Sequence, residues 1–424
     1  MTDHDARRGD FRPDGGATDH DDMLWRTDAV DRVLALRDEF FETLDAEPVP
    51  LDAVAGRVLA SAVEAPADVP ARDHATMDGF AFGAADDYPL TVREQEVFPE
   101  DDPPALSPGE AVRIATGAPL PEGADVVLKR EEATVSDGDL RGPDVEAGTY
   151  VYERASNVAA GETLFDAGDR LSPKDAILLG DVGVESVPVR TRLSVGVAAT
   201  GTEIHEGRQS DLDSNMLAGL VRSWGHDATY EGSTPDEYEV VRSLVERVAR
   251  EHDVVMTTGG TSVGHKDHVV RALADLGEVL FHRVRIRPGK PIAVARLPEQ
   301  DAVAFAIPGK PVGAHTVTSL VARPFFVGPS ATRAGEAAVD ATLSTDVGLG
   351  PEGFEYAVPV TLSDGRATPL GHVDSPLAVY EDTYDPSVLS SSTRATRADG
   401  VVVTTGALSA GETVAVVPYE ALEG

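Results

Sequence analysis

The sequence predicts a multi-domain protein that combines a central α/β domain with β-rich domains. Its 424 residues are too many for one hydrophobic core and correspond to roughly three domains. Between residues 193 and 334, apolar strand-like runs alternate with helix-like stretches. On either side of that segment, short apolar runs lie between Pro and Gly turns, which is typical of β structure.

The part of the chain before residue 193 is predicted to hold an inserted domain. Residues 1–23 lack periodicity, and we expect an acidic disordered tail there. Apolar residues at helical spacing predict a helix over 27–44. Alternating runs predict a β-rich domain over 67–152. The flanking segments, 24–66 and 153–192, can then be halves of one interrupted domain.

The segment 193–334 is predicted to form a largely parallel sheet with helices on both faces. Buried strands are expected at 193–199, 253–257 and 303–307, and helices at 216–224, 235–250 and 313–322. Residues 335–424 return to β patterns and predict a C-terminal β domain. Active sites of parallel α/β sheets lie at the carboxyl ends of the strands, so the loops after these runs are the first candidates for function.

The chain is strongly acidic, with 73 Asp and Glu against 36 Lys and Arg, a net charge of -37, and only five lysines. Such a composition predicts a halophilic protein that stays soluble when high salt screens charge repulsion. An acidic interaction tail is the alternative, but the excess extends far beyond residues 1–23. The charge argues against nucleic-acid binding, which needs basic patches.

Cysteine is absent, which excludes disulfides, thiolate metal sites and cysteine nucleophiles. No apolar run approaches the ~20 residues that cross a membrane, and the N-terminus shows no signal-peptide pattern. We therefore expect a cytoplasmic protein without membrane partners.

A glycine-rich turn over residues 257–267 separates a predicted strand from a predicted helix. Such a turn exposes backbone N–H groups at the positive end of a helix dipole, and it favours anions. It lacks the P-loop and dinucleotide spacings, and a merely tight turn is the alternative. The residues that could bind a phosphate and a metal here are Gly259, Gly260, Thr261, Ser262, Gly264 and Asp267.

Two further loops of the same predicted sheet carry carboxylates beside glycine or hydroxyl groups. They are Thr200-Gly201 with Glu203, and Asp213-Ser214-Asn215. Glu203 and Asp267 are suited as hard oxygen ligands of a divalent metal. Asp213 is open to two interpretations, a site residue and a helix cap, because Asp and Asn are common caps.

Two proline loops each hold a glycine and a cation in restricted backbone. They are Arg287-Pro288-Gly289-Lys290 and Pro308-Gly309-Lys310-Pro311. Arg287 and Lys290 lie close enough to hold one oxyanion. In a chain with so few lysines, matching loops that both carry one indicate anion binding, with solvated turns as the alternative.

The ordered set of motifs resembles the molybdopterin molybdotransferase family, which comprises the MoeA-like proteins and the E domain of gephyrin. Each motif alone is weak, whereas their order over residues 25–424 is specific. The set consists of residues 77–81, 116–125, 200–203, 213–215, 259–267, 288–291 and 308–311.

The resemblance implies a transferase that inserts molybdate into adenylated molybdopterin and releases AMP with the help of a divalent metal such as Mg²⁺. It implies a homodimer, a discontinuous elongated domain at 24–66 and 153–192, and other molybdenum cofactor biosynthesis proteins as partners. The implied metal ligands are Glu203, Asp236 and Asp267. The implied catalytic residues are Asp78, Thr116, Glu203, Asp267 and Lys290, and Arg287, Lys290 and Ser375 are implied to bind the oxyanion.

Three positions depart from the family pattern. Asn157 stands where the family has a carboxylate, Lys310 stands where asparagine is common, and no arginine lies within 354–357. Two other functions stay open: adenylation of molybdopterin by ATP, and molybdopterin binding without catalysis. Molybdate and tungstate are not distinguished, because the two oxyanions are nearly alike in charge and size.

Overall fold

The structure is a computed structural model that describes residues 23–261, 267–329 and 337–424. Most of the predicted N-terminal tail, together with Ser262 and Gly264, lies outside the described residues. The chain forms two compact units, one made of the described residues up to Asp45 with Thr191–Gly424, and the other of Ala46–Arg190. Each unit is described by itself.

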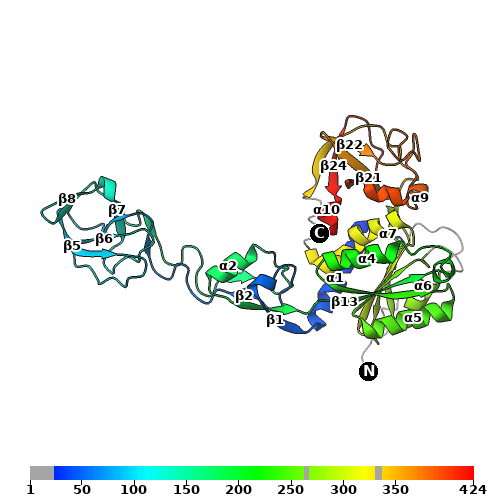
Figure 1. Ribbon diagram of the computed structural model, residues 1–424, viewed down its shortest axis with the longest axis horizontal. Coiled ribbons are helices and arrows are strands. Elements are labelled where there is room, and N and C mark those ends of the chain that lie inside the picture. The colour runs from blue at the N-terminus through cyan, green and yellow to red at the C-terminus, as the bar shows by residue number, and fades with distance from the viewer. Residues whose placement is uncertain (1–22, 262–266, 330–336) are drawn as a thin grey trace, which may run out of the picture. The chain divides into compact units, whose positions relative to one another are not determined.

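The first unit is built on a six-stranded sheet (Figure 1). Its order is β14 (Asp227–Thr234), β13 (Ser194–Thr200), β15 (Val254–Thr258), β19 (Ala302–Ile307), β18 (Ala293–Leu297) and β16 (Glu278–His282). The first four strands are parallel, and β18 and β16 add an antiparallel edge. Every residue of β15 and β19 is buried, because helices cover both faces. The prediction of a largely parallel sheet is confirmed.

Helices pack on the two faces of this sheet. Helices α5 (Tyr238–Glu251) and α6 (His268–Leu276) lie on one face, and α4 (Asp213–Ser223) and α7 (Pro311–Val317) lie on the other (Figure 1). Helix α5 buries Val241, Val245 and Val248, whose spacing places them on one helical stripe. Short connections from strands to helices therefore bring the intervening loops to one edge of the sheet.

Helix α1 (Arg26–Thr43) belongs to this first unit. Phe40 and Phe41 pack on Phe325 of α8 (Arg323–Val327), with ring centroids 5.9 and 6.1 Å apart. The predicted interrupted domain included this helix together with residues 153–192. In the structure, the aromatic side chains of the helix pack against α8. The unit boundary accordingly falls after Asp45.

The C-terminal residues form a closed barrel. Strands β21 (Glu355–Ser363), β22 (Arg366–Pro369), β20 (Val339–Leu343), β24 (Thr413–Pro418) and β23 (Gly400–Thr404) pair in this order, and β21 also pairs with β23. The short strand β17 (Ile286–Arg287) joins the barrel by pairing with β21. This pairing holds the first proline loop against the barrel, and it confirms the predicted C-terminal β fold.

The second unit holds a six-stranded sheet of order β7-β4-β6-β5-β9-β8. Its strands are β7 (Val126–Lys129), β4 (Gly79–Phe82), β6 (Glu110–Ile114), β5 (Leu90–Val97), β9 (Asp139–Arg141) and β8 (Thr134–Ser136). Outside it, β1 (Ala46–Pro50) pairs with β12 (Ser186–Arg190), and β2 (Val63–Glu64) pairs with β11 (Thr163–Phe165). These pairings join segments that precede the sheet in the chain to segments that follow it. The finer division of this unit into two domains stays a prediction. None of the helices in the described ranges is long and apolar enough to cross a membrane.

Candidate active-site cleft

A cleft of about 440 Å³ opens at the carboxyl ends of β13, β15 and β19. Its walls are the loops after these strands, the two proline loops, and α9 (Pro386–Leu389) of the barrel. The chain leaves β13 toward β14 on one side and returns to β15 on the other, so this edge is a topological switch point. Ligands of open α/β sheets bind at such points.

Backbone contacts hold the loops of the cleft together. The Gly259 N–H donates to the Ile307 carbonyl at 3.1 Å, and the Thr200 hydroxyl donates to the Thr258 carbonyl at 3.2 Å. Gly260 has a φ of +64°, and a Cβ there would lie 2.8 Å from both Thr200 Oγ1 and Val269 Cγ2. Glycine is therefore required both by backbone conformation and by space.

Three cations face the cleft. Arg287 holds its guanidinium 4.8 Å from the centre of the Phe354 ring of the barrel, and Lys310 Nζ donates to the Ser387 carbonyl at 3.1 Å. Burial, followed by repulsion from Arg287 and Arg283, lowers the pKa of Lys290. Within the described ranges, neither lysine of the cleft has a carboxylate partner. In so acidic a chain, cations that gather without such partners favour the binding of an anion.

Carboxylates also line this cleft. Glu203, on α3 (Thr202–His205), and Asp236, just after β14, both line it. Asp267 does not line the cleft, but its carboxylate lies near enough to Asp236 for the two charges to repel each other. Burial, with the nearby Asp236 adding a smaller effect against the charge of Arg283, raises the pKa of Asp267 to about 7. Two of the three predicted metal residues thus line the cleft, and the third, Asp267, lies near Asp236.

Asp213 and Ser214 lie behind the cleft wall, whereas Asn215 is exposed. Asp213 and Ser214 are buried, and Asp213 accepts a hydrogen bond from the Thr258 hydroxyl at 3.1 Å. Burial raises the pKa of Asp213 to about 6. Asp211, which precedes this motif, accepts from the Ser214 N–H at 3.1 Å and so caps the start of α4. Asp213 is therefore a buried support of the β15 loop.

Ser375 is not among the residues that line the cleft. Its hydroxyl lies within its own loop, where it accepts from the Gly371 N–H at 3.0 Å and donates to the His372 carbonyl at 2.8 Å. Ser387 and Ser390 are the barrel serines that line the cleft. Asp385 and Pro386 signal a helix start in the sequence. No pattern in the neighbouring residues indicates that this helix, α9, lines the cleft.

Asp78 and Thr116 belong to the second unit. Asp78 Oδ1 accepts from the Thr116 N–H at 2.7 Å and from its hydroxyl at 2.8 Å, and these bonds lower the pKa of Asp78. The structure therefore joins the two residues to each other. Asn157, in the same unit, donates its amide to Asp181 at 3.0 Å.

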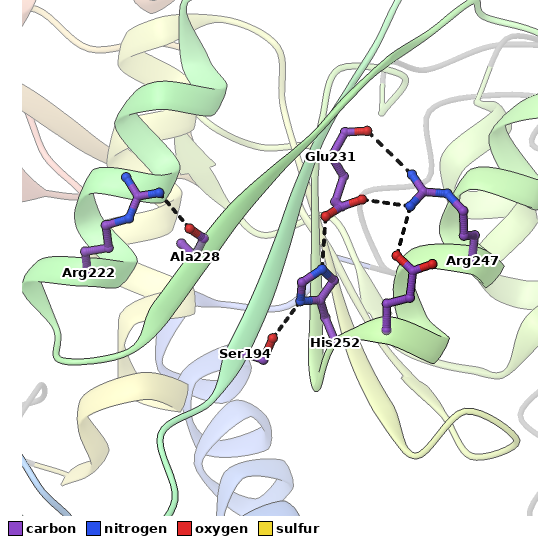
Figure 2. Close-up of polar contacts among 7 residues, drawn as sticks. Ser194, Arg222, Ala228, Glu231, Arg247 and His252 are labelled. Carbon is purple, nitrogen blue, oxygen red and sulfur yellow. Dashed lines mark hydrogen bonds and ion pairs between the residues drawn. The ribbon is translucent and has the colours of Figure 1, made fainter.

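A second group of metal-ligand residue types lies away from the cleft, near the start of β13 (Figure 2). It consists of Glu231, Glu251 and His252. Arg247 joins the two carboxylates at 2.7 and 3.0 Å, and His252 contacts the Ser194 hydroxyl and Glu231 at 2.6 and 3.1 Å (Figure 2). Since Arg247 and Ser194 already satisfy these groups, we interpret the cluster as an ion-pair network.

The fold and cleft define a multidomain α/β protein with a cation-lined cleft at the switch point of its sheet. Profiles of known families match two segments: the MoeA N-terminal region (domain I and II) matches residues 27–183, and a probable molybdopterin binding domain matches residues 196–327.

Individual relatives agree. A molybdopterin molybdenumtransferase of Synechococcus elongatus is 30% identical over 304 residues, covering 67% of this chain and 75% of that protein. One from Bacillus subtilis is 29% identical over 303 residues, covering 66% and 70%. A MoeA molybdopterin biosynthesis protein of Pyrococcus horikoshii is 27% identical and superposes with a TM-score of 0.69 over 94% of this chain and 99% of that chain. The chain belongs to the MoeA-like molybdopterin molybdenumtransferase family.

Proposed function

We propose that the protein inserts molybdate into adenylated molybdopterin and releases AMP. One observation carries the proposal beyond family membership: among the described residues, cations without carboxylate partners and carboxylates with unpartnered oxygens meet at a single switch-point cleft. Molybdate and the adenylate phosphates are anions that such cations attract, and a metal bridging phosphates needs carboxylates. The cleft therefore offers both halves of the required chemistry.

The carboxylates fit a divalent cation. Within the described part of the chain, Oδ1 of Asp236 and Oδ1 of Asp267 are buried without hydrogen-bond partners. Buried carboxylate oxygens in this state cost free energy that a cation ligand would remove. Together with Glu203 they would hold Mg²⁺, which would neutralise phosphate charge at the adenylate. All three side chains would offer oxygen ligands, which Mg²⁺ prefers.

The remaining residues bind and orient the substrates. Arg287, Lys290 and Lys310 attract the oxyanion, and the hydroxyls of Ser387 and Ser390 are candidate hydrogen-bond partners for it. The backbone of Gly259 and Gly260 allows a phosphate to approach closely, because neither residue carries a Cβ.

The test is release of AMP from adenylated molybdopterin when molybdate and Mg²⁺ are added to the purified protein in high salt. We expect release that stops when EDTA removes the metal. No release by the wild type contradicts the proposal. ATP-dependent adenylation of molybdopterin by this chain alone would favour the alternative activity instead.

Lys290 allows a sharper test. Lys290→Gln should raise the KM for molybdate about 10- to 100-fold, because a charge-assisted contact contributes roughly 1.5–3 kcal/mol. Lys174→Gln is the control, since Lys174 is exposed and pairs with Asp175 in the other unit. An unchanged KM in Lys290→Gln would remove this residue from the oxyanion site.

We also propose a homodimer in which Asp78 and Thr116 act at the cleft of a second copy. The proposal rests on the family resemblance and on the exposed position of both side chains. Asp78→Asn and Lys290→Gln should each lower activity, and mixing the two variants under conditions of subunit exchange should restore part of it. Mixtures no more active than their components would contradict this arrangement.

A further inference from the structure

His282 is buried beside Asp267. It is the last residue of the edge strand β16, and its side chain is 10% exposed. Its Nε2 lies 3.7 Å from Asp267 Oδ2. Among the described residues, neither this Nε2 nor Asp267 Oδ1 has a hydrogen-bond partner. An imidazole nitrogen and a carboxylate oxygen buried without partners in one place are costly to the fold, and therefore call for a functional explanation.

The sheet connects this pair with residues of the cleft. His282 pairs with Ala293 of β18, and the proline loop with Lys290 connects the two strands. Asp267 precedes the first residue of α6 and interacts electrostatically with Asp236, which lines the cleft. The imidazole thus lies beside Asp267 and within electrostatic reach of Arg283 and Lys290.

We infer that His282 is a positioning residue for the metal site, whose Nε2–H donates to the Asp267 carboxylate while that carboxylate holds the cation. The inference rests on the proposed function, because it assumes that Asp267 binds Mg²⁺. Metal-binding carboxylates are commonly held by hydrogen bonds from a second layer of residues. The 3.7 Å separation needs only a small movement to become such a bond.

The charges around the ring favour a donor over a direct metal ligand. Arg283 and Lys290 both lie near enough to His282 to act on it electrostatically. A dication bound to the imidazole would add to this positive charge, whereas an N–H donated to a carboxylate adds none. Oxygen ligands alone also agree better with Mg²⁺.

Two variants of similar size distinguish a hydrogen-bond donor role of His282 from a packing role. His282→Gln keeps an N–H near the position of Nε2, and His282→Leu fills the space without one. Isothermal titration of the full-length protein with Mg²⁺ alone should show about 10- to 100-fold weaker binding for His282→Leu, with most of the affinity restored in His282→Gln. Melting curves without metal show whether each variant is folded.

His252→Leu is the matched control. Its imidazole is 11% exposed, similar to that of His282, and it belongs to the ion-pair network of Figure 2. We expect its Mg²⁺ affinity to equal that of the wild type. Weakened binding in His252→Leu but not in His282→Leu would place the cation at Glu231 and Glu251 and overturn the inference.

The outcomes also distinguish this inference from the proposed function. If the wild type does not bind Mg²⁺, or if Asp267→Asn binds it equally well, the metal assignment itself is wrong. If Asp267→Asn loses binding while His282→Leu keeps it, only the role of His282 is wrong. A directly coordinated imidazole nitrogen in the pulsed EPR spectrum of the Mn²⁺-loaded protein would also overturn the positioning role.

Discussion

At the residue scale, Asp213 and Asp267 of the first unit have similar pKa shifts but different surroundings. Asp213 and Asp267 both have pKa values raised by burial, to about 6 and about 7. In both residues Oδ1 is buried without a hydrogen-bond partner in the described part of the chain, and Asp213 Oδ2 accepts from Thr258. Asp213 does not line the cleft, whereas Asp267 lies within electrostatic reach of Asp236, which does line it. The first aspartate supports a loop, and the second is the one with a neighbouring carboxylate in the cleft. Residue type alone does not separate these two roles.

Asp213→Asn should stabilise the protein, and more so at high pH. The pKa of Asp213 is about 6 in the fold and 3.8 as the ordinary value, so ionisation destabilises the fold increasingly between these values and fully above them. An asparagine carries no such cost and still accepts from Thr258. We expect the gain in unfolding free energy to be about 1 kcal/mol larger at about pH 8 than at about pH 5.

Urea unfolding in high salt at both pH values measures this difference. The wild-type protein at each pH is the reference, since all other carboxylates titrate equally in both proteins. A gain that does not grow with pH would show that Asp213 is not ionised against the cost of burial.

At the element scale, the loops after the strands decide the shape of the cleft. The glycines after β15 approach Thr200 at the end of β13, and the barrel holds Arg287 through the pairing of β17 with β21. The glycine signal was visible in the sequence. Pairing between β17 and β21 was not, because it joins residues far apart in the chain and involves only two residues of β17.

Gly260→Ala should destabilise the first unit by about 1–3 kcal/mol, because the backbone is left-handed and the added methyl meets two side chains. Gly219→Ala is the control. A Cβ at this exposed position of α4 would meet nothing within 4 Å, and we expect a gain of about 0.5–1 kcal/mol. Urea unfolding of both variants checks this. Equal effects would mean that the turn tolerates a side chain.

At the scale of the whole molecule, the net negative charge is expected to make the stability of the fold depend on salt. A net charge of -37 repels itself most strongly where ions do not screen it. The ion pairs formed by arginine, such as those of Arg247 with Glu231 and Glu251, offset only a small part of this repulsion.

We expect the melting temperature to rise as KCl is raised from about 0.1 to about 1 M, over which the screening length falls from about 10 to about 3 Å. Calorimetry or circular dichroism measures the change. Sucrose, which stabilises folds without screening, serves as the comparison, and a rise in sucrose without one in KCl would contradict an electrostatic cause.

The sequence by itself determined the α/β sheet, the C-terminal β fold and most of the candidate cleft residues. These depend on local patterns: continuous apolar strands, glycine turns, and cations fixed between prolines. The tertiary structure decided which of those residues meet. It brought Ser387 and Ser390 to the cleft and kept Ser375 within its own loop, placed Asp213 behind the wall, and set His282 against Asp267. The physical reason is that such contacts join residues distant in the chain, where strand pairing and packing, rather than neighbouring residues, determine what a side chain meets.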